Sequence, residues 1–245
     1  GAVPQVGRKT FPWTAVPIPA KVTKQNGDWL WVGNVWIQAQ DALTADEAPG
    51  YFAKLLKTRP AEAPLWYQLR AVAWFLRRDY ENAVKDCSEA LGTFRDNASL
   101  YHLRGQSQHK IEQYDRAQDD NSEEIRKDEA LTDFDQALEL DPTLISAWCN
   151  RGHAWFKRGD YEQARRDFVE AIARGPDEPC GYYDLARMYA MCPFPDYRDG
   201  TKAVELATQA CELSRWEEWL CVATLAAAQA EAGDFALAVK YQRQA

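Results

Sequence analysis

A helical spacing of apolar residues is clearest between residues 145 and 178. The apolar side chains of its first half fall on one stripe of a helix, and those of its second half do the same. The stripe residues are Trp148, Gly152, Trp155, Phe156, Ala164, Phe168 and Ala171. Gly159-Asp160 separates the halves and predicts a turn, and Pro176 follows Gly175 where the second helix should end. The stretch therefore predicts two helices joined by a tight turn.

Gly152 interrupts an otherwise favourable helix sequence, since glycine costs roughly 1 kcal/mol relative to alanine inside a helix. We interpret it as the point at which a neighbouring helix approaches closely. The order small, large, small at Ala164, Phe168 and Ala171 fits such packing. The complete pattern resembles the tetratricopeptide repeat (TPR), a helix–turn–helix unit of about 34 residues. The resemblance implies a TPR α-solenoid, a right-handed superhelix of antiparallel helix pairs.

The same spacing recurs along the chain and predicts a TPR solenoid over residues 44–245. Thr44 and Glu47 fit a capping box, which predicts a cap helix over residues 44–60. Repeats are then predicted to begin near residues 64, 98, 145, 179 and 217.

Two of these repeats contain insertions. In the repeat that begins near residue 98, the second-helix residues arrive about thirteen positions later than a 34-residue period allows. We expect a polar loop near 115–121 and a second helix lengthened by about two turns, with Asn121 and Glu124 as its capping pair. In the repeat that begins near residue 179, two prolines predict a loop over 192–199, and Asp199 is the expected N-cap of the following helix.

Residues 1–43 do not follow the helical period. Prolines interrupt any helix there, Asn26-Gly27 is a hairpin signal, and residues 28–37 are rich in aromatic and β-branched side chains. This arrangement resembles the closing strands of a small SH3-like barrel, which implies a small and incomplete SH3-like β module over residues 1–43. The stretch 198–235 resembles the C-terminal repeats of a bacterial family of TPR proteins that often carries such a module.

The resemblance to TPR proteins also implies a concave groove lined by the first helix of each repeat. The groove residues projected onto this chain include Leu65, Gln68, Val72, Phe75, His102, Gln106, His109, Lys110, Cys149, His153, Phe156, Lys157, Tyr183 and Arg187. We expect a partner peptide or segment with apolar and acidic residues to bind there. Alternatively, the apolar residues Leu65, Val72 and Phe75 pack against the N-terminal module and leave no open apolar groove.

Motifs for other chemistry are missing from the sequence. It has no phosphate-binding glycine-rich loop, serine nucleophile elbow or HExxH motif, so we expect neither catalysis nor a cofactor. TPR clamps for C-terminal carboxylates use a set of residues of which only Asn150 matches here, so we do not expect a chaperone-tail clamp. One alternative is a metal site, for which the candidate ligands are His102, Cys149, His153 and Cys180. Without a local metal-binding spacing, we interpret these as ordinary groove residues.

Arginine recurs at one position of three repeats, at Arg70, Arg104 and Arg151. We expect the stem of each arginine to pack on the helices while its guanidinium reaches a neighbouring carboxylate.

Composition and charge narrow the class of partner. The 245 residues carry a net charge of −8, which argues against nucleic acid or an anionic membrane as the main partner. No apolar run reaches the ~18 residues of a membrane span. The six cysteines form no CxxC pair, and we expect buried free thiols. We interpret Gly1 as a trimmed start, so a preceding signal peptide is compatible with the chain.

These features favour a soluble, non-catalytic scaffold for protein–protein interaction. Two alternatives stay open. One is a concavity for a small ligand or a metal ion, and the other is a structural module that associates with itself.

Overall fold

The structure is a computed structural model that describes the backbone of residues 22–26, 29–32, 35–38, 44, 46–118 and 127–245. It divides into two compact units, Gly1–Phe94 and Arg95–Ala245, each of which is described by itself. This division falls after Phe94 and not at the predicted boundary between residues 43 and 44, which stays a prediction.

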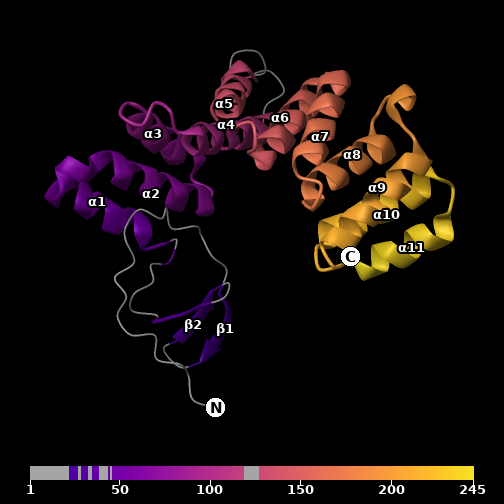
Figure 1. Ribbon diagram of the computed structural model, residues 1–245, viewed down its shortest axis with the longest axis horizontal. Helices are drawn as coiled ribbons and strands as arrows, with labels where there is room; N and C mark the ends of the chain where they lie inside the picture. Colours follow the sequence, from indigo (N-terminus) through magenta and orange to yellow (C-terminus); the bar gives the residue numbers. More distant parts are fainter. Residues whose placement is uncertain (1–21, 27–28, 33–34, 39–43, 45, 119–126) are drawn as a thin grey trace. The chain divides into compact units, whose positions relative to one another are not determined.

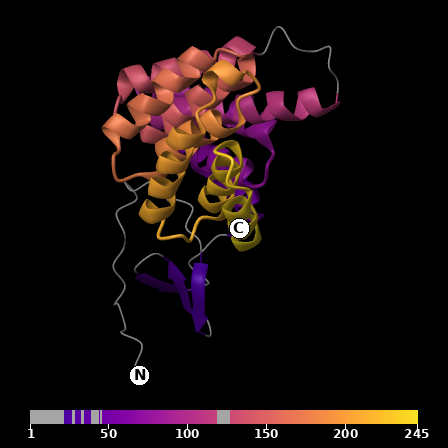
Figure 2. The ribbon, with the colours of Figure 1, turned by 90° about the vertical axis from the view of Figure 1, so that its right-hand side faces the viewer.

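Three described strands of the first unit form an antiparallel meander. They are β1 (Val22–Asn26), β2 (Trp29–Val32) and β3 (Val35–Gln38), in the order β1-β2-β3 (Figure 2). Asn26 pairs with Trp29, so β1 and β2 meet where Asn26-Gly27 predicted a hairpin. An SH3-like module over residues 1–43 stays a prediction, because most of that segment lies outside the described residues.

The helices of the first unit are α1 (Ala48–Thr58), α2 (Ala63–Leu76) and α3 (Tyr80–Leu91), with a 3-10 turn η2 (Pro60–Glu62) after α1. The predicted capping box precedes α1. Thr44 Oγ1 accepts from the backbone N–H of Glu47 at 3.3 Å, and the Glu47 carboxylate accepts from the backbone N–H of Thr44 at 3.3 Å. The core shared by α1 and α2 consists of Ala48, Phe52, Trp66, Leu69 and Ala73.

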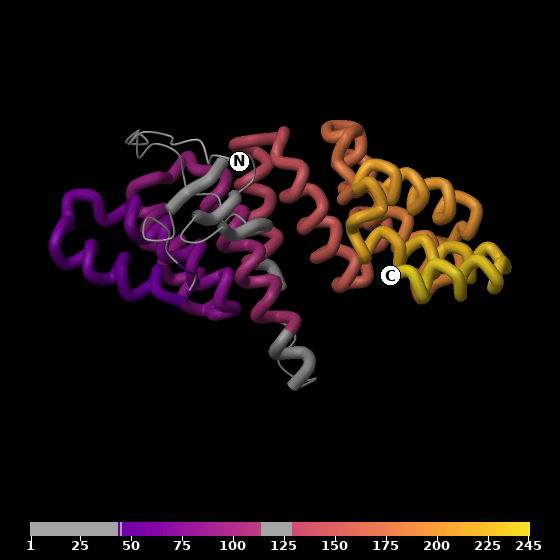
Figure 3. Tube along the Cα trace, turned by 90° about the horizontal axis from the view of Figure 1, so that it is seen from below, coloured from indigo at the N-terminus to yellow at the C-terminus, as the bar shows by residue number. Residues whose placement is uncertain are grey.

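The second unit is a stack of helix pairs, α4/α5, α6/α7, α8/α9 and α10/α11 (Figure 1, Figure 3). Its helices are α4 (Ala98–Gln118), α5 (Lys127–Leu140), α6 (Ile145–Arg158), α7 (Tyr161–Arg174), α8 (Pro179–Met191), α9 (Gly200–Leu213), α10 (Trp219–Glu231) and α11 (Phe235–Gln244). A 3-10 turn η3 (Pro195–Tyr197) lies in the predicted loop between α8 and α9. The first helices of neighbouring pairs also contact each other, α4 with α6, α6 with α8 and α8 with α10.

Glycine–aspartate turns separate the helices within two of these pairs. Gly159 has a φ of 88°, in the region that favours glycine, and Asp160 caps α7 by accepting from the backbone N–H of Gln163 at 3.2 Å. Gly233 and Asp234 repeat the arrangement before α11. The turn predicted at Gly159-Asp160 is therefore confirmed.

The close approach predicted at Gly152 is also confirmed. A Cβ atom on Gly152 would lie 2.5 Å from Cε1 of Phe168, which is 1% exposed and belongs to α7. Gly105 faces Phe134 in the same way, with a Cβ that would lie 3.0 Å from Cε1 of that ring. The missing side chain lets the two helices of a pair pack around one phenyl ring.

Each of the three recurring arginines reaches an aspartate on the second helix of its own pair, as predicted. The ion pairs are Arg70–Asp86, Arg104–Asp133 and Arg151–Asp167, each with a shortest N–O distance of 2.7 Å. Every guanidinium also lies over an aromatic ring three residues earlier, those of Tyr67, Tyr101 and Trp148. The ion pair and the ring therefore tie the two helices together within each repeat.

The insertion in the repeat at residue 98 lies differently from the prediction. Helix α4 continues to Gln118, so the polar loop expected near 115–121 is wrong for its first part. Residues 110–118 contain neither glycine nor proline and are rich in good helix formers, which allows the first helix to continue. The expected capping pair, Asn121 and Glu124, lies outside the described residues.

Candidate partner-binding groove

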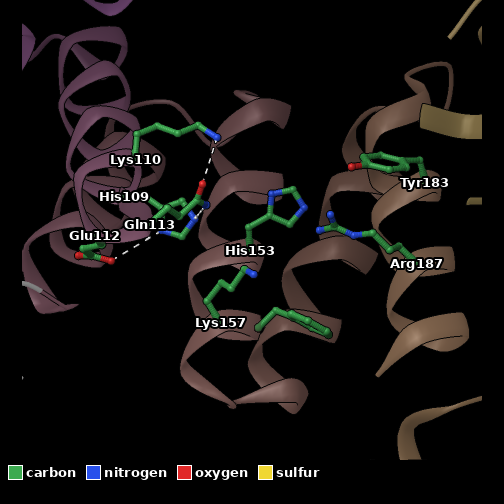
Figure 4. Close-up of a pocket in the computed structure, with 9 residues that line it drawn as sticks. His109, Lys110, Glu112, Gln113, His153, Lys157, Tyr183 and Arg187 are labelled. Carbon is green, nitrogen blue, oxygen red and sulfur yellow. Dashed lines mark hydrogen bonds and ion pairs between the residues drawn. The ribbon is translucent and has the colours of Figure 1, made fainter. Parts of the chain in front are cut away.

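A concavity of about 630 Å³ lies between the first helices α4, α6 and α8 of the second unit (Figure 4). It is lined by His109, Lys110, Glu112, Gln113, His153, Phe156, Lys157, Tyr183 and Arg187. Each helix contributes residues about one turn apart, because side chains at i and i+4 share a helix face. The solenoid stacking therefore brings together residues that are far apart in the sequence.

The α4 side of the concavity is built around His109, which is 7% exposed. Its Nε2 atom lies 2.8 Å from Nε2 of Gln113, and Lys110 Nζ donates to Oε1 of Gln113 at 3.4 Å. The Gln113 amide therefore donates to the imidazole, which leaves the proton of neutral His109 on Nδ1. That Nδ1 atom is buried, lies 3.8 Å from Glu112 Oε2, and has no hydrogen-bond partner within the described residues.

The α6 and α8 sides are joined by a buried carboxylate. Asp184 is 2% exposed, and its Oδ1 atom lies 2.6 Å from His153 Nε2. Nη2 of Arg187 lies 3.7 Å from the same oxygen, with the arginine side chain 38% exposed. In Figure 4 the His153 ring and the Arg187 guanidinium face each other across the opening between α6 and α8.

The charges around the concavity are mostly positive. Lys110, Lys157 and Arg187 carry cations there, while Glu112 supplies the one carboxylate of its lining. The Glu112 side chain is only 11% exposed. The accessible rim therefore favours an anionic ligand group, although the whole chain carries a net charge of −8.

Two cysteines meet one helical turn before His153 on α6 and Asp184 on α8. The thiol of Cys149 on α6 donates to Sγ of Cys180 on α8, with 3.1 Å between the sulfurs. This hydrogen bond raises the pKa of Cys149 and lowers the pKa of Cys180, because it stabilises a thiolate on the acceptor. Burial raises the pKa of Cys149 further.

The predicted groove residues of the second unit fall into two groups. Seven of them line the concavity, namely His109, Lys110, His153, Phe156, Lys157, Tyr183 and Arg187. His102, Gln106 and Cys149 are not part of its lining. The site thus contains more than half of the groove residues projected onto this unit.

His102 is a packed residue of the repeat interface and not part of the cavity wall. Its Nε2 atom pairs with Nδ2 of Asn150 at 2.9 Å, and its ring centroid lies 6.1 Å from that of Phe134. Burial lowers the pKa of His102 to about 4. The imidazole is therefore neutral near pH 7.

The predicted groove residues of the first unit lie among its own helices. Leu65 packs against the core shared by α1 and α2, and Gln68 is 7% exposed. Phe75 makes an edge contact with Tyr80, with ring centroids 5.4 Å apart, while Val72 is half-buried. A binding role for these four residues stays a prediction.

Sequence reasoning missed three residues of the site, Glu112, Gln113 and Asp184. The first two lie beyond the usual end of a first helix, on the continuation of α4. A prediction that the first helix continues into the insertion would have placed both residues next to the groove. Asp184 carries no local signal, because its partner His153 lies 31 residues earlier on a neighbouring repeat.

The described part of the chain contains no group of three or more His, Cys, Asp and Glu side chains arranged to hold a metal ion. The candidate ligands pair with one another instead, as Cys149 with Cys180 and His153 with Asp184. Among the described helices, none is both long and apolar enough to cross a membrane. All six cysteines are free thiols, and five of them are buried.

Comparison with known proteins identifies the class of fold. Residues 145–178 match the family model of the tetratricopeptide repeat. Among solved structures, PilW, a type IV pilus biogenesis factor, superposes with a TM-score of 0.65 and 20% identity over 84% of this chain and 85% of its own. A thermophilic TPR protein of Thermus thermophilus gives a TM-score of 0.59 and 18% identity, with 82% and 90% covered. The protein thus carries a TPR repeat in a mainly helical structure that resembles TPR solenoids.

Curated relatives include a heat shock protein homolog and an Hsp70-Hsp90 organizing protein. The heat shock protein sti1 homolog of Schizosaccharomyces pombe is 29% identical over 54% of this chain and 22% of its own length. The Hsp70-Hsp90 organizing protein 1 of Glycine max is 24% identical over 71% of this chain and 34% of its own. The chain therefore spans about a third or less of these two relatives.

Proposed function

We propose that the protein is a non-catalytic scaffold for protein–protein interaction that binds an acidic partner segment between α4, α6 and α8. The observation that carries the proposal is the positive rim of this concavity in an acidic chain. TPR solenoids in general offer an extended concave surface for binding. The match to the TPR model and the similarity to the Hsp70-Hsp90 organizing protein 1 support protein partners as a class.

The lining suits a short segment with one carboxylate beside an apolar side chain. Arg187 presents a planar fork that matches a carboxylate, and Lys157 adds an exposed ammonium group one turn after His153. Phe156 and Tyr183 supply apolar surface next to these cations. A volume of about 630 Å³ is sufficient for a few side chains of a peptide.

The test is a selection of peptides from a random display library against the wild-type protein and a Lys157→Gln, Arg187→Gln variant. The matched control is Arg166→Gln, Lys240→Gln, which removes two exposed cations from α7 and α11. We expect peptides enriched in Asp and Glu, with affinity reduced at least about tenfold in the first variant, equivalent to 1.4 kcal/mol, and nearly unchanged in the control. Affinity should also fall as salt rises.

Equal loss of binding in both variants would show that net charge, and not this concavity, recruits the peptides. Peptides that bind all three proteins alike would move the binding site elsewhere. Circular dichroism of each variant confirms that the helices are intact before binding is compared.

Self-association is a second candidate, favoured by apolar side chains at the C-terminal helix pair. Trp219 on α10 is 61% exposed, and Phe235 and Val239 on α11 are 70% and 52% exposed. Phe235 and Val239 lie one turn apart on α11 and share a face of that helix, which offers apolar surface to a second copy of the chain. Sedimentation equilibrium of the wild type and of a Trp219→Ser, Phe235→Ser variant tests this candidate. A monomer at every concentration in both proteins would exclude it.

A further inference from the structure

We propose that Cys149 and Cys180 form a site of reversible oxidation, at which exchange with an external disulfide links α6 covalently to α8. The two thiols belong to the first helices of neighbouring repeats, 31 residues apart in the chain. Their helices also carry the cavity residues His153 and Tyr183. The linkage would therefore lie directly beside the proposed binding site.

The geometry already resembles that of a disulfide before oxidation. The two Sγ atoms are 3.1 Å apart, and a disulfide bond is about 2.05 Å long. The sulfurs therefore need to approach by only about 1 Å, which small side-chain rotations can provide. Helices α6 and α8 are in contact, so the two cysteines already lie side by side in the stack.

The two cysteines differ in exposure in a way that assigns the order of attack. Cys180 is partly exposed and can meet a reagent from solution, whereas Cys149 is 5% exposed. The thiol of Cys149 donates a hydrogen bond to Cys180 and so favours the thiolate there. Cys180 is therefore the attacking thiolate, and Cys149 is the thiol that resolves the mixed disulfide.

The oxidant is a small-molecule disulfide, R–S–S–R, and the reaction proceeds in two exchanges. The Cys180 thiolate attacks one sulfur of R–S–S–R, forms a mixed disulfide and releases one RS⁻. Cys149 then loses its proton and attacks Sγ of Cys180, which releases the second RS⁻. The protons of the two cysteines end on the two released thiolates. Two electrons pass from the protein to the external disulfide, which leaves as two RSH.

The bond would couple oxidation to partner binding. Cys149 lies one turn before His153 on α6, and Cys180 lies one turn before Asp184 on α8. A covalent link at this point holds the His153–Asp184 pair and the neighbouring Arg187 in one arrangement. This coupling rests on the proposed function, whereas the oxidation itself does not.

The oxidation is tested on the full chain, reduced and then treated with glutathione disulfide. The protein is then denatured, the remaining free thiols are blocked with N-ethylmaleimide, and the digested protein is mapped by mass spectrometry. We expect a crosslinked peptide pair that contains Cys149 and Cys180, and blocked thiols at the four other cysteines. A crosslink between any other pair, or glutathione that stays attached to the wild type without closure, would overturn the proposal.

Single variants test the order of attack. Cys149→Ser should accumulate glutathione on Cys180, and Cys180→Ser should react much more slowly than the wild type. The matched control is Cys211→Ser, which removes a fully buried thiol from α9 and should leave the crosslink unchanged. Rapid modification of Cys149 in the Cys180→Ser variant would refute the assignment of roles.

Binding of a fluorescent Glu-rich peptide to the reduced and oxidised wild type tests the coupling. We expect affinities that differ by at least about fivefold, and no difference for a Cys149→Ser, Cys180→Ser double variant carried through the same treatment. A mapped crosslink with unchanged affinity would overturn the coupling alone. Failure of the reduced protein to bind the peptide would count against the proposed function, while the mapped crosslink would still support the oxidation site.

Discussion

Replacement of Gly152 by alanine tests whether the helix pairs are built around a single enclosed ring. The added Cβ would lie 2.5 Å from Cε1 and 2.8 Å from Cδ1 of Phe168. Carbon atoms in good contact are about 3.5–4.0 Å apart, so the two groups overlap by about 1 Å. Phe168 is 1% exposed and packs with Ala164, Leu185 and Met188, so its ring has little room to move away.

Two opposing effects decide how much Gly152→Ala changes the free energy of unfolding. Alanine gains about 1 kcal/mol over glycine in helix propensity. Overpacking of a filled core costs about 1–3 kcal/mol, and an overlap with an enclosed ring belongs at the upper end of that range. We therefore expect Gly152→Ala to lower the free energy of unfolding by about 2 kcal/mol.

The residue types at these two facing positions in the other repeats agree with this packing argument. The repeats at 98 and 145 pair glycine with phenylalanine, as Gly105 with Phe134 and Gly152 with Phe168. In the repeat at 64, the same two positions hold alanine and cysteine, at residues 71 and 87. A larger residue on the first helix thus accompanies a smaller one on the second.

The assay is urea denaturation followed by circular dichroism, with hydrogen exchange of α6 and α7 amides as the local measure. The same substitution is made in a Phe168→Leu background, which removes the ring carbons that would overlap. There, Gly152→Ala should cost little or should stabilise the protein by up to about 1 kcal/mol. An equal cost in both backgrounds, or a wild-type chain stabilised by Gly152→Ala, would refute the packing argument.

Two further predictions concern buried polar groups. Asp86→Asn should cost about 3 kcal/mol in urea denaturation, because it leaves the Arg70 guanidinium without its buried counter-charge, while the nearby exposed Glu89→Gln should cost less than about 0.5 kcal/mol. Similar losses in both variants would contradict this. For His102, the pKa is about 4 in the folded protein and near 6.5 when unfolded, so the unfolded chain binds the extra proton first. Stability should therefore fall by on the order of 3 kcal/mol as pH drops from 6.5 to 4, and His102→Gln should remove most of this dependence in denaturation series at several pH values.

The repeat spacing was sufficient to predict the helices and much of the candidate site. Aromatic and glycine residues at fixed intervals predicted the helix pairs, and the glycine–aspartate turn was confirmed at Gly159. Projection of the groove positions found seven residues of the cavity lining, among them His109, His153 and Arg187. Such features depend on the period of one helix and on the packing of one pair, which a local sequence pattern encodes.

The insertion shows where local patterns become ambiguous. The late arrival of the second-helix residues revealed extra residues but not which helix would contain them. Because residues 110–118 favour a helix, α4 continues and carries Glu112 and Gln113 into the site. The competition between a loop and a longer helix is decided by propensity together with tertiary packing.

The sequence by itself determined the repeating helix pair, its turn and the glycine that admits the phenyl ring. The tertiary structure decided which side chains of different repeats meet. Asp184 joins His153, and Cys180 joins Cys149, across 31 residues of chain. Neither pair follows from a helical period, because the rotation between neighbouring repeats sets which turns of α6 and α8 face each other. That rotation results from the packing of whole helices, and it brings these groups together beside the concavity.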